Sequence, residues 1–408
     1  MPVRATKRGA ERTPLDGDFD VLICGASFAG LAVARELRAT GARVLVLDRY
    51  EIGERQTSAC AAPTAWLRNL GLEASIRQTF GSLIVRTPRA TARWPLGWTF
   101  STFDYRQLCE LLWAQRGAGT EFETAKVNGK AVSPSTTPAA DPTGPRSGSS
   151  ALVSGAVPGD ATVVHTDRGD VSASLIVDAL GWKRILAAGQ VQPPEARLSR
   201  GLEVHPAGAG ADLELWIDKR VIRAGYGWSF PAGDERRVGV GSFDPRDHVK
   251  APTVALADEL GLPPVGYQGN WIPHELRPAT EDGVFFAGDS AGHCLPLTAE
   301  GIRTAFYFGI ACGRELRAVL AGLQTAEQAL ARYGAFSASH GWKYALMLQA
   351  QHAVPRLPPR ALASVTRAFA RAGVSHRAFR HYLRIAPPEA ALPAPPRAAL
   401  AGAEAVAA

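Results

Sequence analysis

The sequence predicts an α/β fold of composite α+β type, in which a parallel-sheet domain carries an inserted, mostly antiparallel sheet and a helical region follows. Three observations lead to this prediction. An apolar strand, a Gly-rich turn, a helix and a second strand succeed one another over residues 20–48. Short alternating strand patterns occupy residues 161–244, and helical patterns dominate after residue 299. Hydrophobic residues make up 46% and charged residues 20% of the chain, which is typical of a globular protein.

The same patterns divide the 408 residues into regions. A disordered leader and a disordered tail are expected at the ends, over 1–18 and 386–408. The parallel-sheet domain is predicted from three segments, which are 19–80, 101–180 and 278–322, with a flexible Pro-, Ser- and Gly-rich insertion at 131–160. The sheet domain takes 81–100 and 181–277, and the helical region takes 323–385. Residues 64–80 are predicted to be helical, as are residues 104–116.

Several classes of protein are excluded. No apolar run reaches the roughly 18 residues that a membrane-spanning helix needs. The N-terminal residues lack the continuous apolar segment of a secretory signal. The five cysteines are scattered, without a CxxC pair, so neither a disulfide framework nor a metal site is expected. A reducing cytoplasm is the expected location.

The Gly-rich turn has the composition of a nucleotide site. It follows the pattern GxGxxG with a serine at the middle glycine, and the predicted contacts are Gly25, Ala26, Ser27, Ala29 and Gly30. A tight turn before a helix N-terminus leaves free N–H groups for a pyrophosphate. Asp48 ends the second strand, where it can accept hydrogen bonds from a ribose. Arg49 and Arg55 follow it as candidate phosphate contacts, although a surface salt bridge would explain Arg55 equally.

A later segment points to a flavin rather than a nicotinamide. The strand at 284–287 ends in Gly288-Asp289, whose carboxylate can hold a ribityl hydroxyl. A loop containing Pro296 then leads to a long helix that begins near Gly301 and Ile302. The N–H groups and dipole of that helix would face the flavin and stabilise negative charge on the reduced ring. The predicted cofactor is therefore FAD.

These segments, together with Leu175–Trp182, make the chain resemble the geranylgeranyl reductase family within the aromatic-hydroxylase-like FAD flavoproteins. The resemblance covers nearly all of residues 19–320 and rests most specifically on Gly288-Asp289-Ser-Ala-Gly292, Pro296 and Glu300-Gly301-Ile302. It implies a Rossmann-type FAD-binding domain and a flavin-contacting residue near the start of the 104–116 helix, assigned here to Arg106. No second GxGxxG occurs. The reductant is thus expected to be NADPH bound transiently, or a separate electron donor such as a flavin reductase or a ferredoxin.

Three aromatic residues lie on one face of a predicted strand. Period-two alternation aligns Tyr226, Trp228 and Phe230, followed by Pro231. An aromatic core strand would show the same pattern. The resemblance to the family's YxWxFP segment favours a substrate wall beside the flavin, suited to an apolar small molecule or lipid. His293 and Cys294 lie beside the predicted flavin loop as further pocket residues or proton donors.

Cys60 is the candidate catalytic residue. The resembling family carries a cysteine in a CGG-type segment at this place, where it faces the flavin; here Ala61 and Ala62 follow the cysteine. Reducing a C=C bond needs a hydride on one carbon and a proton on the other, and a positioned thiol can supply the proton. A small buried structural cysteine is the alternative.

The resemblance implies an FAD-dependent oxidoreductase that reduces C=C bonds of an isoprenoid or prenylated substrate. Two alternatives remain open at this stage. One is a flavin monooxygenase or epoxidase acting on an apolar or aromatic substrate, and the other is a flavin-assisted cyclase without net redox change. The reductase and the monooxygenase share a fold, and fold alone does not separate their chemistries.

The charge of +7 is concentrated near the C-terminus. No acidic residue lies between Glu327 and Glu389, while nine basic residues do. The segment Arg356–Arg384 interleaves arginines with apolar residues. It is either a solvated helix face over a packed core, or a contact with the inner face of an anionic membrane or with an isoprenoid diphosphate. No recognition motif accompanies it, so nucleic acid is not an expected partner.

Overall fold

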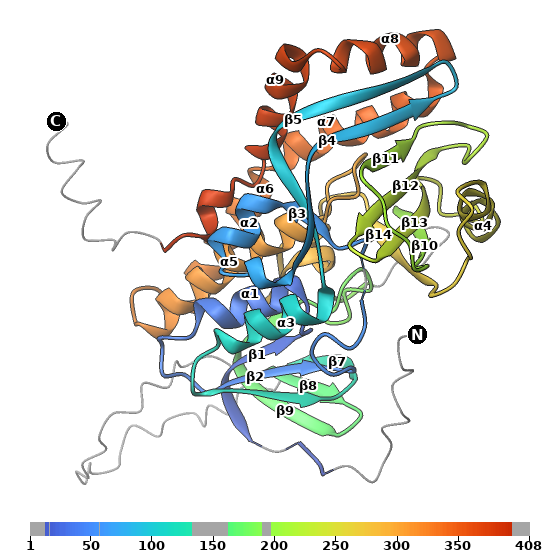
Figure 1. Ribbon diagram of the computed structural model, residues 1–408. Helices are drawn as coiled ribbons and strands as arrows, with labels where there is room; N and C mark the ends of the chain where they lie inside the picture. Colours follow the sequence, from blue (N-terminus) through green and yellow to red (C-terminus); the bar gives the residue numbers. More distant parts are fainter. Residues whose placement is uncertain (1–12, 16, 57, 133–161, 190–196, 394–408) are drawn as a thin grey trace, which may run out of the picture.

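A computed structural model describes residues 13–15, 17–56, 58–132, 162–189 and 197–393 of the chain (Figure 1). Two eight-stranded sheets form its framework. The first sheet has the order β15-β16-β9-β1-β2-β6, and β16 to β6 run parallel. Its path strands are β1 (Asp18–Cys24), β2 (Val44–Asp48), β6 (Thr120–Thr124), β9 (Gly169–Asp178), β15 (Thr280–Glu281) and β16 (Val284–Phe286). An antiparallel extension is formed by β7 (Val127–Val132) and β8 (Thr162–Thr166). This α/β sheet confirms the predicted fold class.

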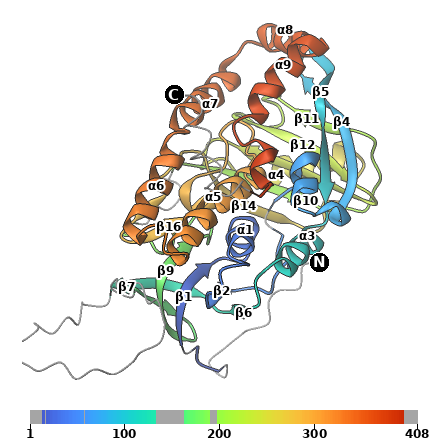
Figure 2. The same ribbon diagram turned by 90° about the vertical axis from the view of Figure 1, so that its left-hand side faces the viewer.

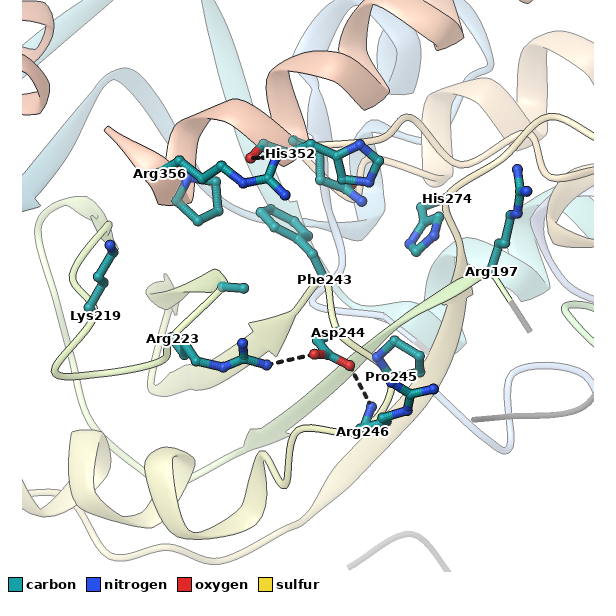
Figure 3. A pocket seen from close by; sticks show the side chains of 13 residues that line it. Arg197, Lys219, Arg223, Phe243, Asp244, Pro245, Arg246, His274, His352 and Arg356 are labelled. Atoms are coloured by element: carbon teal, nitrogen blue, oxygen red, sulfur yellow. Dashed lines mark hydrogen bonds and ion pairs between the residues drawn. The ribbon is translucent and has the colours of Figure 1, made fainter. Parts of the chain in front are cut away.

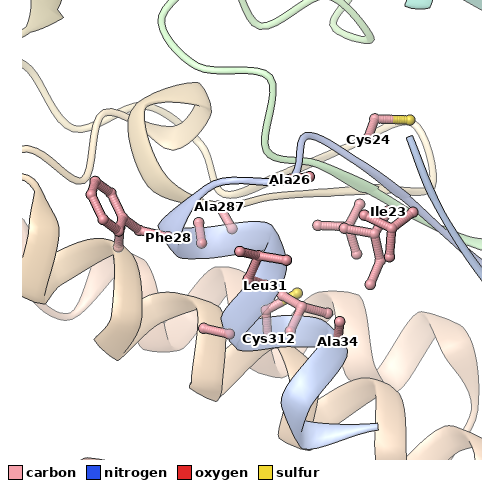
Figure 4. Close-up of a cluster of buried hydrophobic side chains, with 14 of the residues drawn as sticks. Ile23, Cys24, Ala26, Phe28, Leu31, Ala34, Ala287 and Cys312 are labelled. Carbon is pink, nitrogen blue, oxygen red and sulfur yellow. The ribbon is translucent and has the colours of Figure 1, made fainter. Parts of the chain in front are cut away.

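The helix after the first strand is enclosed by the core. All residues of α1 (Phe28–Glu36) are buried, and α1 packs against α5 (Ile302–Leu320) (Figure 2). Figure 4 shows Leu31 and Ala34 of α1 beside Cys312 of α5, with Ile23 of β1 nearby. Close approach requires small residues, because a Cβ added at Gly309 of α5 would lie 2.7 Å from the Ala29 carbonyl oxygen. The β-α-β unit predicted over residues 20–48 is therefore present, with both of its strands.

The second sheet is mostly antiparallel, as predicted, with the order β14-β10-β13-β12-β11-β4-β5-β3. One pair, β11 with β4, is parallel. Its strands are β3 (Ala61–Pro63), β4 (Ile76–Thr87), β5 (Ala90–Phe103), β10 (Leu198–Val204), β11 (Leu213–Trp216), β12 (Gly225–Ala232), β13 (Glu235–Ser242) and β14 (Gln268–Pro273). The helix α4 (Lys250–Glu259) packs on β13 and β10.

The helix predicted over residues 64–80 is wrong beyond residue 69. The helix α2 covers Thr64–Asn69, and a short 3₁₀ turn at Glu73–Ser75 leads directly into β4. Residues 76–80 pair with β5 instead, because backbone pairing along a 14-residue strand replaces the local helical preference. The helix α3 (Tyr105–Ala114) agrees with the prediction. The predicted insertion at 131–160 lies almost entirely outside the described residues, and the domain boundaries stay a prediction.

The C-terminal region is helical, as predicted, and part of it packs on the second sheet. Its helices are α6 (Ala326–Ala338), α7 (Gly341–Ala353), α8 (Pro359–Phe369) and α9 (Ala372–Leu383). The last two lie over the long β4–β5 hairpin (Figure 1). Trp94 of β5 stacks near Phe369 and Phe379 at centroid distances of 4.7 and 6.4 Å, and its Nε1 donates to the Thr366 carbonyl at 2.9 Å.

The tail predicted to be disordered from residue 386 is packed up to residue 391. Trp66 Nε1 donates to the Ala386 carbonyl at 3.1 Å, and Asn69 Nδ2 donates to the Pro388 carbonyl at 2.8 Å. Arg314 donates to the Ala390 carbonyl at 2.9 Å. Trp66 is fully buried, and a buried donor needs an acceptor, which the tail backbone supplies. Residues 394–408 lie outside the described part.

The seven arginines from Arg356 to Arg384 are all exposed on α8, α9 and the turns that flank them. Apolar neighbours such as Leu362 and Phe379 face the packed side. This is the arrangement of a solvated helix face. Within the described ranges, no helix combines the length and the apolarity needed to cross a membrane.

We expect Gly309→Ala to lower the free energy of unfolding by about 1 to 3 kcal/mol, because the new methyl group would overlap the α1 backbone. Gly373→Ala is the matched control, since a Cβ at this helical glycine meets no atom within 4 Å. It should be neutral or stabilise by up to about 1 kcal/mol. Urea unfolding of both variants measures the difference. Equal changes in the two variants would show that α1 and α5 are not closely packed.

Candidate active site

The Gly-rich turn is enclosed by backbone. Gly25 has φ +112°, and a Cβ there would lie 2.2 Å from the Ala179 carbonyl oxygen. A Cβ at Gly30 would lie 1.8 Å from the Gly25 carbonyl oxygen. Both positions therefore require glycine. Ser27 is the N-cap of α1 but makes no capping hydrogen bond, so within the described part of the chain the first-turn N–H groups of α1 lack a side-chain cap.

Asp48 lies beside this turn. Its carboxylate accepts from the N–H of Ala26 at 2.9 Å and from the N–H of Tyr50 at 3.1 Å. Burial raises the pKa of Asp48, although these hydrogen bonds oppose the shift. The exposed Arg49 and Arg55 both lie over the Tyr50 ring, at 4.8 and 5.2 Å from its centroid. The candidate phosphate contacts thus flank the end of β2.

Arg106, predicted as a flavin contact, has an exposed side chain on α3, and its backbone packs against Gly53. The neighbouring Tyr105 is the residue that reaches the Gly-rich turn. Its hydroxyl shares a hydrogen bond of 3.1 Å with Ser27 Oγ. Tyr105 is buried, so the start of α3 supports the turn through the tyrosine.

Three segments that are distant in sequence meet at the carboxyl ends of β1, β9 and β16. The buried Asp178 accepts a hydrogen bond of 2.7 Å from Ser290 Oγ, which joins the end of β9 to the segment after β16. A Cβ at Gly288 would lie 3.0 Å from the Cβ of Ala29 in α1. The carboxyl edge of a parallel sheet is where such folds bind nucleotides.

Asp289 supplies the test of whether an FAD would fit. Burial raises the pKa of Asp289 to about 6, with Arg277 opposing the shift. Among the residues that the structure describes, nothing hydrogen-bonds to its carboxylate. Gly301, at the start of α5, lies so close that its Cβ would be 3.6 Å from Asp289 Oδ1. A half-buried carboxylate without a hydrogen-bond partner in the described part of the chain, next to a helix N-terminus without a side-chain cap, matches the hydroxyl-rich ribityl chain of a flavin.

The loop 295–301 before α5 is strained and firmly held. Leu297 and Ala299 have φ of +67° and +51°, which is unfavourable for residues other than glycine. The Thr298 carbonyl accepts from the Tyr226 hydroxyl at 2.7 Å, and Thr298 Oγ1 accepts from the Tyr382 hydroxyl at 2.9 Å. Pro296 is buried within the same loop. The loop is therefore fixed from the second sheet and from α9.

The predicted aromatic row is present. Tyr226, Trp228 and Phe230 are half-buried on one face of β12, while the residues between them are fully buried. The Tyr226 and Trp228 rings lie 6.0 Å apart. Because Tyr226 also bonds to Thr298, the row lies directly against the 295–301 loop. Pro231, on the other face, accepts at its carbonyl from Thr102 Oγ1 at 2.8 Å.

Two glycines opposite the row were not predicted as site residues. Gly239 and Gly241 of β13 pair with Trp228 and Tyr226 across the ladder. A Cβ at Gly239 would lie 2.2 Å from the Trp228 ring, so the indole lies flat over this glycine. The alternation Gly-Val-Gly at 239–241 was the available signal, because glycine in a strand interior marks a close approach.

His293 lies away from the aromatic row, contrary to its prediction as a substrate contact. It is fully buried, stacks on Phe308 at a centroid distance of 3.7 Å, and shares a hydrogen bond of 3.0 Å with Ser337 Oγ. Burial holds the pKa of His293 well below its usual value. It belongs to the core under α5 and α6. Cys294 remains near the site, with Sγ 3.3 Å from the place where a Gly301 Cβ would be.

Cys60 is held in an unusual conformation. It is fully buried with φ +53°, and its Sγ–H donates to the Ser58 carbonyl at 3.1 Å. Its own carbonyl accepts from the N–H of Phe103 at 3.0 Å and from Arg237 Nη1 at 3.1 Å. Burial raises the pKa of the Cys60 thiol well above its usual value, despite the nearby Arg237, so the thiol stays protonated.

A buried ionic network connects Cys60 with the aromatic row. Arg237 Nε donates to Glu235 at 2.8 Å, and His205 contacts Glu235 at 3.4 Å and Glu203 at 2.9 Å. Trp228 Nε1 completes the path by donating to Glu203 at 3.1 Å. Period two places Glu235 and Arg237 on one face of β13, but the contacts of His205 with Glu235 and of Trp228 with Glu203 join different strands and have no signal in the sequence.

The fold is that of Rossmann-type FAD-binding flavoproteins. The chain matches no protein-family model. It is 24% identical over 355 residues to a digeranylgeranylglycerophospholipid reductase of Methanosphaera stadtmanae, covering 79% of this chain and 83% of the relative. This similarity confirms the resemblance to the geranylgeranyl reductases among the FAD-dependent oxidoreductases.

Solved structures share the fold. A geranylgeranyl bacteriochlorophyll reductase-like protein from Thermoplasma acidophilum superimposes with a TM-score of 0.73 at 16% identity, over 91% of this chain and 97% of the other. A probable FAD-dependent monooxygenase from Pseudomonas aeruginosa superimposes with a TM-score of 0.62 at 19% identity, over 86% and 99%. At these identities the likeness shows the fold alone.

The network makes stability depend on pH through His205. Burial disfavours its charge, but hydrogen bonds to Glu203 and Glu235 outweigh burial and raise the pKa of His205 from 6.5 to about 9. The stabilisation of the folded state by protonated His205 is complete below pH 6.5. It disappears as the pH rises through about 9, because His205 then loses its proton in the folded state. We expect wild type to lose about 3 kcal/mol of unfolding free energy over this interval relative to His205→Gln. Urea unfolding at pH 6, 7.5 and 9.5 measures this, and parallel pH profiles would contradict the assignment.

Proposed function

We propose that the protein is an FAD-dependent oxidoreductase that reduces C=C bonds of an isoprenoid or prenylated apolar substrate. The observation that carries this proposal is the position of the aromatic row against the 295–301 loop, fixed by the hydrogen bond from Tyr226 to Thr298. An apolar wall beside a flavin edge suits a polyene chain. The reductases that this chain resembles support the same chemistry.

Different residues of the chain would bind different parts of the FAD. The N–H groups at the start of α1 would bind the pyrophosphate, and Asp48 would accept from a ribose hydroxyl. Asp289 would accept from a ribityl hydroxyl. When bound, reduced FAD supplies the hydride for one carbon of the double bond. NADPH, or a separate donor such as a flavin reductase or a ferredoxin, would restore the reduced cofactor.

Cys60 would supply the proton for the other carbon. Its thiol is protonated at neutral pH because burial raises its pKa, and a proton donor must carry its proton before the step. Arg237 holds the carbonyl of Cys60 and thereby orients the residue. The exclusion of water around Cys60 limits competing proton exchange. Contact of Arg356–Arg384 with an anionic membrane stays a prediction.

An anaerobic assay tests the function. Purified, FAD-loaded protein receives chemically reduced flavin and a geranylgeranyl lipid, and the products are weighed by mass spectrometry. A gain of about 2 mass units per reduced bond without oxygen supports reduction. A gain of about 16 that requires oxygen would replace this proposal with a monooxygenase or epoxidase. An isomeric product of unchanged mass would indicate a cyclase.

We expect Cys60→Ser to lower kcat by about 100-fold or more, because a positioned proton donor contributes about that factor. The FAD content and the unfolding midpoint should change little, since serine keeps the size and can donate to the Ser58 carbonyl. Cys312→Ser is the matched control, because Cys312 is a buried thiol in the core between α1 and α5. Full activity of Cys60→Ser would assign Cys60 a structural role.

A further inference from the structure

Figure 3 shows a basic pocket beside Phe243, and its volume is about 560 Å³. The segments that follow β13 and β14, the turn before β12, and the end of α7 with the turn after it converge on the pocket. Its cationic lining residues are Arg197, Lys219, Arg223, Arg246 and Arg356. Asp244 is the acidic member of the lining. The pocket therefore concentrates positive charge on a concave surface.

Much of this charge is not compensated. Arg223 pairs with Asp244 at 2.6 Å, and Arg197 pairs with Glu275 at 2.8 Å. Within the described ranges, the side chains of Lys219, Arg246 and Arg356 have no acidic group within 4.0 Å. Unpaired cations around a hollow attract an anion, and arginine matches the geometry of phosphate oxygens.

A second observation points to a missing ligand. Gln351 lines the same pocket and is only 1% exposed. Its Oε1 accepts from the N–H of Leu297 at 2.8 Å, but its Nε2 has no hydrogen-bond partner among the described residues. Buried amide donors are nearly always satisfied, so this Nε2 is available to an acceptor in the pocket.

His274 contributes no charge to this pocket. His274, which also lines the pocket, shares a hydrogen bond of 2.9 Å with Ser199 Oγ. Burial lowers the pKa of His274 to about 4, and His352, Arg197 and Arg277 add to the shift. His274 is consequently neutral, and the positive charge of the pocket comes from its lysine and arginines.

The pocket adjoins the first residue of the aromatic row and the 295–301 loop. Phe243 lines it and places its ring 6.0 Å from the ring of Tyr226, the first residue of the aromatic row. Gln351 joins the pocket to the 295–301 loop through Leu297. A molecule with an anionic end in the pocket could extend an apolar chain along Tyr226, Trp228 and Phe230.

We propose that this pocket binds the phosphate or diphosphate headgroup of the prenyl substrate, and so sets which double bonds lie beside the reaction site. The proposal rests on the proposed function. The shared chemistry is an anionic phosphate attached to an isoprenoid chain, whether as a free prenyl diphosphate or as a glycerophospholipid. No covalent step occurs in the pocket.

The test uses full-length, FAD-loaded protein carrying Lys219→Gln, Arg246→Gln and Arg356→Gln together. Steady-state reduction is measured with geranylgeranyl diphosphate, with digeranylgeranylglycerophosphate and with geranylgeraniol, which lacks phosphate. We expect KM to rise at least tenfold for a phosphate-bearing substrate, with little change in kcat, and to stay the same for geranylgeraniol. The control removes the same charges elsewhere, from the exposed Arg38, Lys126 and Arg332 by substitution with glutamine.

Inorganic pyrophosphate provides a readout that needs no turnover. Isothermal titration calorimetry should show that it binds wild type and competes with geranylgeranyl diphosphate, and that the triple variant binds it at least tenfold more weakly. Gln351→Met removes the buried donor with little change in size, and it should weaken pyrophosphate binding severalfold.

The outcomes separate this proposal from the proposed function. Reduction of C=C bonds with equal KM in the variant and wild type would overturn the pocket and leave the function standing. Pyrophosphate binding that the variant abolishes, in a protein that reduces none of the lipids, would keep the anion site and overturn the function. Pyrophosphate binding without competition would overturn the headgroup assignment. A rise in KM for only one of the two phosphate-bearing substrates supports the proposal. That substrate then shows whether the headgroup belongs to a prenyl diphosphate or to a phospholipid.

Discussion

The buried guanidinium of Arg303 is the interaction on which the arrangement of the site depends. Its side chain is fully buried in the first turn of α5, where an unpaired cation would be costly. Glu300 accepts from its Nε at 2.6 Å, and the carbonyls of Tyr382, Leu383 and Ala386 accept from its other nitrogens at 3.1 Å. One charge thereby fastens the 295–301 loop and the start of α5 to the last helix. The C-terminal segment is part of the site for this reason.

The 295–301 loop also contacts the second sheet. Tyr226 and Tyr382 bind Thr298 from two directions, and Tyr382 also bonds to Glu300. Positive φ values at Leu297 and Ala299 persist because these contacts over-determine the loop. The candidate flavin site, the aromatic row and the basic pocket are consequently connected through a few residues. A displacement at Thr298 would alter all three together.

Some of the site could be predicted because its signals are local. The turn at Gly25 and Gly30 needs glycine wherever a strand enters a helix closely, and period two aligned Tyr226 with Trp228. Other features depend on contacts with residues distant in the chain, which local sequence patterns do not predict. His293 sits beside the flavin segment in sequence, yet the turn directs it towards Phe308. Residues 76–80 form a strand because β5 is available to pair with them.

The sequence alone determined the α/β class, the nucleotide turn, the FAD-type segments and the aromatic row, since each follows from spacing within a short stretch. Only the tertiary structure decided that Arg237 reaches the backbone of Cys60, that Gly239 makes room for Trp228, and that Lys219, Arg246 and Arg356 surround one hollow. The physical reason is that charges and steric contacts act between groups distant in the chain. Burial and charge compensation become defined only when both sheets and the C-terminal helices are in place.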